Sequence, residues 1–98
     1  MFKEKVYSIT KKIPKGRVST YRDVAHALNC RAYRAVGNAL NKNKHPIIIP
    51  CHRVVSSNGS IGGYSGGIKN KIKLLKKEGI GIRNNKIIDF EKVLYKFK

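Results

Sequence analysis

Acidic residues are scarce in this sequence. The 98-residue chain has five aspartates and glutamates against 22 lysines and arginines, which gives a formal net charge of +17. Such an excess of positive charge produces a strong positive potential and a salt-dependent affinity for polyanions. The composition therefore favours nucleic acid as the partner, with an anionic membrane surface as the competing candidate.

The sequence also lacks a long apolar run, a lipidation signal and the apolar core of a signal peptide. These absences argue against a membrane partner and predict a protein that stays inside the cell. A hydrophobic content of 41% is ordinary for a globular protein and argues against a disordered basic tail. Because a chain of 98 residues buries only a modest core, we expect one small domain. We also expect the protein to act as a monomer.

Cysteine and histidine are too sparse for a disulfide scaffold or a zinc site. Cys30 and Cys51 do not form a Cys-x-x-Cys pair, and His26, His45 and His52 are scattered along the chain. Two cysteines in an intracellular chain indicate reduced thiols. Scattered histidines do not provide the ligand spacing of a zinc site. The sequence thus predicts no metal site.

Helical periodicity dominates the sequence, so we expect a mainly α fold with short strands. Ser19-Thr20 stands where a helix N-cap belongs, and Asp23 follows at the spacing of a capping box. The isoleucines at 47–49 indicate a short buried strand, and Asp89 is expected to cap the last helix. The predicted helices cover residues 2–12, 21–28, 32–41, 68–78 and 90–97, and a hairpin with its turn at Asn84-Asn85 covers residues 80–89.

Residues 21–41 have the dimensions of a helix-turn-helix unit, because a three-residue turn joins two short helices. On the outward face of the second helix, Arg34, Asn38 and Asn41 recur at positions i, i+4 and i+7. These residue types bind phosphates and base edges. A merely solvated helix face is the alternative, but the charge of the chain favours nucleic acid. We therefore expect a winged helix-turn-helix-like DNA-binding domain.

A thiol, an imidazole and a guanidinium follow one another at Cys51, His52 and Arg53. Nearby positive charge favours the thiolate, which is the nucleophilic form of cysteine. In an extended segment, however, adjacent side chains point to opposite sides. Contact between Cys51 and His52 therefore requires a bridging water or a helical turn that begins at Cys51.

Glu78 is a carboxylate in the last turn of a predicted helix, where the helix dipole disfavours an anion by about a few tenths of a kcal/mol. One interpretation is a surface salt bridge to Lys73 or Lys77. The other is that Glu78 orients His52, which would complete a Cys-His-Glu relay that follows the logic of the serine-protease triad.

Five segments in this order carry a resemblance to a known family. They are Ile13–Tyr21, Arg34–Leu40, Pro50–Val54, Gly62–Gly67 and Leu74–Gly79. Together they resemble the O6-alkylguanine-DNA alkyltransferases, which transfer alkyl groups from damaged guanine to their own cysteine. The resemblance covers about residues 2–82 and is to the C-terminal catalytic and DNA-binding domain of that family. It implies that residues 1–98 form a single alkyltransferase domain without the additional N-terminal domain that many members carry.

The resemblance implies repair of double-stranded DNA that contains O6-alkylguanine, with the helix-turn-helix unit in the minor groove. Arg34 would hold the gap left by the flipped nucleotide. The implied DNA-binding residues are Thr20, Tyr21, Arg34, Asn38, Asn41 and Arg53. The implied base pocket consists of Pro46, Val54, Tyr64, Ser65 and Gly66, from the strand end and the glycine-rich loop 56–67.

The same resemblance implies a catalytic role for five residues. Cys51 would accept the alkyl group once and irreversibly. His52, reaching Cys51 through water and steadied by Glu78, would generate the thiolate. Tyr21 would donate a proton to the departing guanine, and Asn43 would tie the recognition helix to the active-site strand.

Two departures from the family pattern affect the helix-turn-helix unit. The turn at residues 29–33 is one residue shorter than the family pattern, and Tyr33 replaces a small residue beside Arg34.

Two rival functions stand beside repair: a relative that binds alkylated DNA without transfer, and a small basic architectural protein. The first typically lacks the reactive cysteine, and the second needs neither Cys51 nor its neighbours. A cysteine hydrolase is a weaker third alternative.

Overall fold

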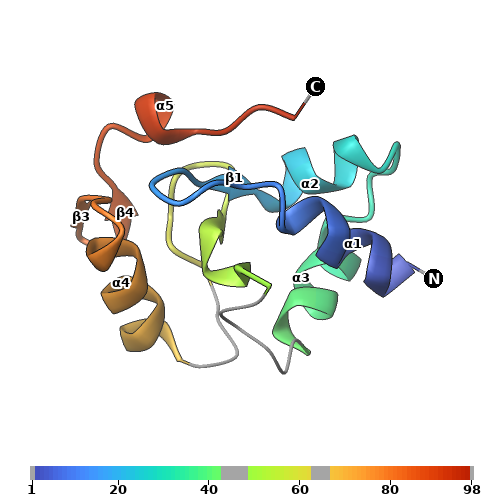
Figure 1. Ribbon diagram of the computed structural model, residues 1–98, viewed down its shortest axis with the longest axis horizontal. Coiled ribbons are helices and arrows are strands. Elements are labelled where there is room, and N and C mark those ends of the chain that lie inside the picture. The colour runs from blue at the N-terminus through green and yellow to red at the C-terminus, as the bar shows by residue number, and fades with distance from the viewer. Residues whose placement is uncertain (1, 43–48, 63–66, 98) are drawn as a thin grey trace.

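The computed structural model describes residues 2–42, 49–62 and 67–97, which form a molecule of 34 × 26 × 20 Å. Most of the regular structure is helical and the strands are only two residues long, so the expected mainly α fold with short strands is confirmed (Figure 1). The elements are α1 (Phe2–Thr10), β1 (Ser19–Thr20), α2 (Tyr21–Ala27), α3 (Tyr33–Asn41), η1 (Cys51–Arg53), β2 (Val54–Val55), α4 (Ile68–Lys77), β3 (Ile82–Arg83), β4 (Lys86–Ile87) and α5 (Phe90–Val93). None of the helices in these described ranges is long and apolar enough to cross a membrane.

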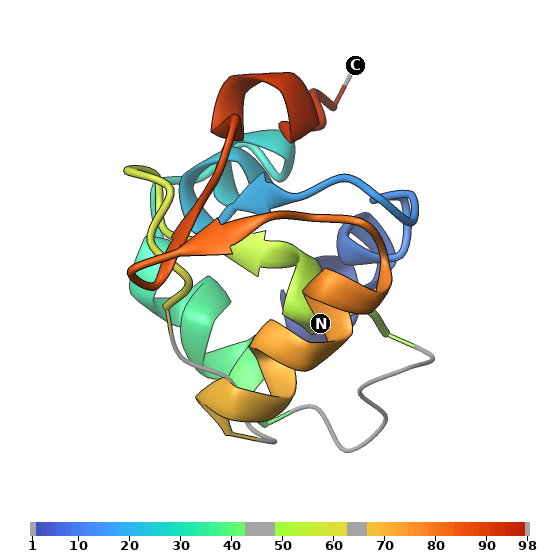
Figure 2. The same ribbon diagram turned by 90° about the vertical axis from the view of Figure 1, so that its left-hand side faces the viewer.

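The segment 51–55 lies at the centre of the molecule, between the α1–α3 group and α4 (Figures 1 and 2). Two clusters of buried side chains meet there. Cys51 and Val54 pack with α1, α2 and α3, whereas Val55 packs with Val18, Leu75 and residues near the hairpin. Because successive side chains of a strand point to opposite faces, β2 contributes one valine to each cluster. The cysteine turn is therefore anchored from both sides.

The parallel pairing of β1 with β2 places the start of α2 beside this central segment. Ser19 pairs with Val54, and Thr20 pairs with Val55. The Thr20 hydroxyl also accepts a hydrogen bond of 2.9 Å from the backbone N–H of Asp23, as predicted for the N-cap. One residue thus fixes both the strand pairing and the beginning of α2.

The hairpin over 80–89 is confirmed, with β3 antiparallel to β4. Asn84 and Asn85 both have positive φ angles, +51° and +60°. A two-residue hairpin turn with both central residues left-handed matches the twist of its strands, and asparagine adopts this conformation more readily than most residues.

The predicted last helix is wrong beyond Val93. Val18 donates its N–H to the Val93 carbonyl at 2.9 Å, and Tyr95 donates its N–H to the Val18 carbonyl at 2.7 Å. This pairing draws the chain into an extended course over the core, in place of a helix that would have ended at Phe97. Asp89 adopts a left-handed conformation and its side chain makes no capping hydrogen bond, so the predicted cap is also wrong.

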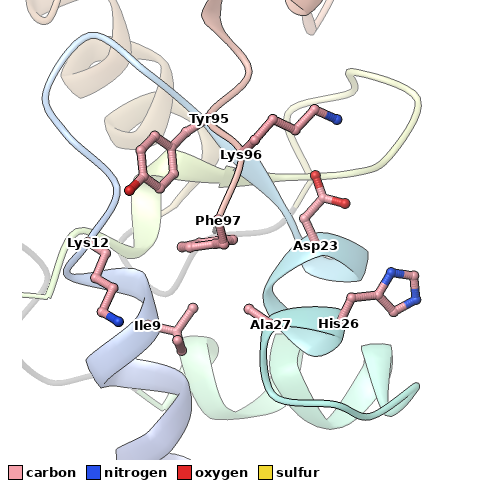
Figure 3. A pocket seen from close by; sticks show the side chains of 8 residues that line it. All are labelled: Ile9, Lys12, Asp23, His26, Ala27, Tyr95, Lys96 and Phe97. Carbon is pink, nitrogen blue, oxygen red and sulfur yellow. The ribbon is translucent and has the colours of Figure 1, made fainter.

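The extended C-terminal segment packs across the ends of two helices. Figure 3 shows Phe97 between Ile9 of α1 and Ala27 of α2, at a groove of about 840 Å³. Tyr95 and Phe97 contact the buried cluster of α1–α3 and meet each other edge to face, with ring centroids 5.2 Å apart. Aromatic packing of this kind stabilises the tail against the core.

Of the strand predicted at the isoleucines 47–49, only Ile49 can be compared with the structure, because residues 47 and 48 lie outside the described ranges. Ile49 lies in a bend, and its carbonyl accepts a hydrogen bond from the N–H of Cys51 at 2.7 Å. For Ile49 the strand prediction is therefore wrong, and the strand of this region is the Val54–Val55 pair that follows the cysteine.

Candidate active site

Cys51 begins a 3₁₀ turn, which was one of the two solutions expected for its neighbourhood with His52. The Arg53 N–H donates to the Pro50 carbonyl at 3.0 Å, and the Val54 N–H donates to the Cys51 carbonyl. This turn replaces the extended geometry in which consecutive side chains diverge. Cys51 is 4% exposed, so its thiol lies in the protein interior beside the α1–α3 cluster.

His52 and Glu78 form the contact that the sequence suggested. The His52 Nε2 atom lies 3.0 Å from the Glu78 Oε2 atom, and both side chains are largely buried. Burial lowers the pKa of His52 below its ordinary value despite the opposing influence of Glu78, so the imidazole is neutral at pH 7. An ionised carboxylate can only accept, so Nε2 carries the proton and Nδ1 is the basic nitrogen.

Arg53 holds Glu78 in place through a two-pronged contact. Its Nε donates to Glu78 Oε1 at 2.9 Å and its Nη2 donates to Oε2 at 2.6 Å, while Nη1 donates to the Ile13 carbonyl at 3.0 Å. Burial raises the pKa of Glu78, but the hydrogen bonds from Arg53 and His52 outweigh it and lower the pKa overall. Glu78 thus binds Arg53 and His52 rather than the surface lysines, and the predicted DNA contact of Arg53 stays a prediction.

Tyr21 is the first residue of α2 and faces the cysteine turn. Burial, followed by the charge of Cys51, raises the pKa of its hydroxyl, so the phenol keeps its proton at neutral pH. Gly62 passes close to this hydroxyl: a Cβ atom there would lie 3.1 Å from the tyrosine oxygen, and the φ angle of Gly62 is +75°. Glycine is therefore required where the loop 56–67 crosses Tyr21.

Sequence reasoning missed a buried lysine at the same place. Lys71 of α4 is fully buried, its Nζ donates to the Val54 carbonyl at 2.8 Å, and Nζ lies 5.9 Å from the Tyr21 ring centroid. Burial lowers its pKa to about 8, against the opposing influence of Cys51. Ile68, the first residue of α4, is by contrast 49% exposed.

One signal in the sequence could have found Lys71. It lies four residues before the apolar Leu75, about one helical turn away on the same face, so it belongs to the stripe that helical geometry turns inward. The abundance of lysine in this helix concealed that position.

The outward face of α3 carries the exposed polar stripe that the sequence predicted. Arg34, Asn38 and Asn41 are all exposed on it. Tyr33, the residue that departs from the family pattern, lies against His26 of α2, with its hydroxyl 3.0 Å from the His26 Nε2 atom. Thr20, by contrast, is buried and its hydroxyl caps α2, so this geometry gives no support to its predicted contact with DNA.

Several predicted residues cannot be placed in this site. Asn43, Pro46, Tyr64, Ser65 and Gly66 lie outside the described residues, so their roles stay predictions. In the part of the chain that the structure describes, no group of three histidine, cysteine, aspartate or glutamate side chains could hold a metal ion.

Comparison with known proteins gives this site a context. Residues 1–80 match the family model described as 6-O-methylguanine DNA methyltransferase, DNA binding domain. The chain belongs to this family. Its helix-turn-helix-like arrangement of α2 and α3 and its short strands agree with the solved structures of the family.

The relatives differ in how much of their length this chain spans. The methylated-DNA–protein-cysteine methyltransferase of Thermococcus kodakarensis is 51% identical over 80 residues, which are 81% of this chain and 45% of the relative. Mycobacterium tuberculosis OGT in complex with DNA has a TM-score of 0.76 and 40% identity, over 79% of this chain and 48% of that chain. This chain therefore spans about half the length of these relatives.

A third relative matches over nearly its whole length. S. pombe Atl1, in complex with damaged DNA containing O6-carboxymethylguanine, has a TM-score of 0.82 and 28% identity. The match covers 97% of this chain and 94% of that chain. The fold is thus shared with proteins solved on DNA.

Proposed function

We propose that this protein repairs DNA by direct reversal of damage, in an irreversible, stoichiometric transfer of the alkyl group from O6-alkylguanine to Cys51. The observation that carries this proposal is the buried thiol on a turn whose next residue, His52, is held by Glu78. A nucleophile, a base and a carboxylate that orients the base follow the logic of the catalytic triads. Membership of the methyltransferase family supports this assignment.

In the proposed reaction, the basic Nδ1 of His52 takes the thiol proton of Cys51 through a water molecule. The sulfur then attacks the alkyl carbon in line with the leaving oxygen. The S–C bond forms, the C–O6 bond breaks, and its electron pair moves onto guanine. Tyr21 donates a proton to the departing base, and exchange with solvent then returns the proton held by His52 to Tyr21. The net change is that a thiol and an alkylated guanine become a thioether and guanine, with no change of total charge. The electrophile arrives on the DNA, so the chemistry needs no cofactor.

The DNA-binding part of the proposal rests on α2, α3 and the positive charge of the chain. The exposed stripe Arg34, Asn38 and Asn41 would face the minor groove, and Arg34 would fill the gap left by the flipped nucleotide. Flipping costs about a few kcal/mol, which contacts to the extruded base and the backbone offset. We propose that residues 1–98 combine DNA binding and transfer in one monomeric domain.

A second candidate is recognition of alkylated DNA without transfer. The match to Atl1 over 94% of that chain favours it, because the two chains correspond almost end to end. The buried Cys51, followed on its turn by a His52 that Glu78 orients, favours transfer instead, since binding alone needs no oriented base next to a thiol in the chain. An architectural role would likewise need neither the buried thiol nor the contact between His52 and Glu78.

Intact-protein mass spectrometry separates these functions. The protein is mixed with a duplex that contains one O6-methylguanine, and Cys51→Ser and Cys30→Ser variants are treated in parallel. Transfer predicts a gain of one methyl group per molecule in the wild type and in Cys30→Ser, but none in Cys51→Ser. Tight binding to the lesion without any gain in mass would contradict repair and leave a damage-recognition protein.

A further inference from the structure

The α4 helix buries an ammonium group beside the cysteine turn. A lysine is rarely buried without a specific partner, because transferring its charge from water into the interior is unfavourable. Lys71 is fully buried, whereas Lys73, Lys76 and Lys77 of the same helix are exposed. The position of Lys71 is therefore not explained by the general basicity of the chain.

The contacts of Lys71 connect it to the turn that carries the thiol. Its Nζ donates to the Val54 carbonyl at 2.8 Å, and the N–H of Val54 donates to the Cys51 carbonyl. The ring of Tyr21 also lies near the ammonium, with its centroid 5.9 Å away. The ammonium is thus fixed by the same short segment that presents Cys51.

The neighbouring charges show what the ammonium can do. Arg53 is opposed by the Glu78 carboxylate at 2.6 Å, and burial keeps His52 neutral at pH 7. Neither group therefore supplies net positive charge to a thiolate at Cys51. The charge of Cys51 raises the pKa of Lys71, against the larger effect of burial. This interaction is reciprocal, so a protonated Lys71 also favours the thiolate.

We propose that Lys71 is a positioning residue for the proposed alkyl transfer, whose ammonium stabilises the Cys51 thiolate from the interior side of the turn. This inference rests on the proposed function for its role in repair, but the coupling between the two charges can be measured without DNA.

Among the described residues, the other titratable groups around Cys51 and Lys71 are His52 and Arg53 of η1, Glu78 that binds both of them, Tyr21 of α2 and Tyr7 of α1. The charge of Cys51 also contributes to raising the pKa of both tyrosines, after the larger effect of burial. Both tyrosines therefore keep their protons at neutral pH, and a shift of the Cys51 titration caused by a change at Lys71 reports on the ammonium.

The test follows the ionisation of Cys51 by thiolate absorbance against pH in a Cys30→Ser background, which leaves a single thiol. Lys71→Met removes the charge at similar length, and Lys71→Arg keeps it. Lys73→Met makes the same change on the exposed face of the same helix. We expect Lys71→Met to raise the midpoint of the Cys51 titration by about one pH unit, which corresponds to roughly a tenfold loss of thiolate at neutral pH. Lys71→Arg should retain most of the wild-type behaviour, and Lys73→Met should match the wild type.

The same variants are compared in single-turnover methyl transfer at saturating duplex. Lys71→Met should be about tenfold slower at neutral pH, and the deficit should shrink as the pH rises, because a purely structural defect would not depend on pH in this way. If Lys71→Met does not fold, Lys71→Gln provides the comparison, since it keeps a donor for Val54 without the charge.

An unchanged Cys51 midpoint in a folded Lys71→Met or Lys71→Gln variant would overturn the proposal. Failure of the proposed function looks different. If the wild type transfers no methyl group while the midpoint still shifts, repair is contradicted and the coupling between Lys71 and Cys51 stands.

Discussion

At the residue scale, the Arg53 guanidinium ties together three segments that are distant in sequence. It donates two hydrogen bonds to Glu78 at the end of α4 and one to the Ile13 carbonyl between α1 and β1. Because Glu78 in turn binds His52, the position of the imidazole depends on Arg53 through this carboxylate. Arg53 therefore supports both the fold and the candidate active site.

Replacing Arg53 by methionine should lower the free energy of unfolding by about 2–4 kcal/mol, because it leaves the Glu78 carboxylate without its main counter-charge. Arg22→Met, on the exposed surface of α2, should change it by less than about 0.5 kcal/mol. Urea unfolding measures both. Adding Glu78→Gln to Arg53→Met should recover part of the loss, and strictly additive effects would contradict the pairing.

Single residues also show which parts of the candidate site could be predicted from the sequence. Cys51, His52 and Glu78 stood out because their types are rare in this chain or oppose the helix dipole, and the structure brings His52 and Glu78 together. Lys71 did not stand out, because its type is common and only its packing is unusual. Arg53 was expected to contact DNA, and its internal hydrogen bonds depend on the approach of α4, which local patterns do not specify.

At the scale of elements, the structure tests the cap of α2. Thr20→Ala removes the acceptor for the Asp23 N–H and should lower the free energy of unfolding by about 1 kcal/mol. Thr20→Ser keeps the hydroxyl and should stay closer to the wild type. Urea unfolding of both variants checks this expectation. Equal losses in the two variants would assign the effect to the buried methyl group instead of the cap.

The helices that were predicted well are those whose signals are local. The predicted starts of α1, α2 and α4 agree with the structure, and the Asn84-Asn85 turn was found from its residue types. The failures involve tertiary contacts. The last helix is cut short because Val18 pairs with the backbone of the tail, and Ile49 lies in a bend that leads into the cysteine turn.

At the scale of the whole molecule, a formal charge of +17 is carried by a fold with a radius of gyration of 12.0 Å. Charges at this density repel one another and weaken the compact state, while they attract a polyanion. The exposed lysines contribute to both effects. Lys71 is buried instead, and burial lowers its pKa from the ordinary lysine value of 10.5, which applies in the unfolded chain, to about 8 in the folded protein.

This difference makes folding stability depend on pH. Between about pH 8 and pH 10 the folded protein has lost the Lys71 proton while the unfolded chain retains it, so the free energy of unfolding rises with pH. The rise should amount to roughly 2 kcal/mol, since each pKa unit corresponds to about 1.4 kcal/mol. Above that range the gain should be offset, because burial raises the pKa of Tyr21 and the unfolded chain ionises its tyrosines first.

Urea unfolding at pH 7, 8, 9 and 10 measures the effect, with Lys71→Met as the comparison. Effects of pH on the rest of the chain act on both proteins, so only the difference between their pH profiles reports on Lys71. That difference should be flat below about pH 8 and should then change in favour of the wild type as the buried ammonium loses its proton. Parallel profiles from pH 7 to pH 10 would show that the folded protein does not hold Lys71 at a lowered pKa. A buried Lys71 ammonium that destabilises the folded state at neutral pH is what we expect if the role of this lysine is to stabilise the Cys51 thiolate and not the fold.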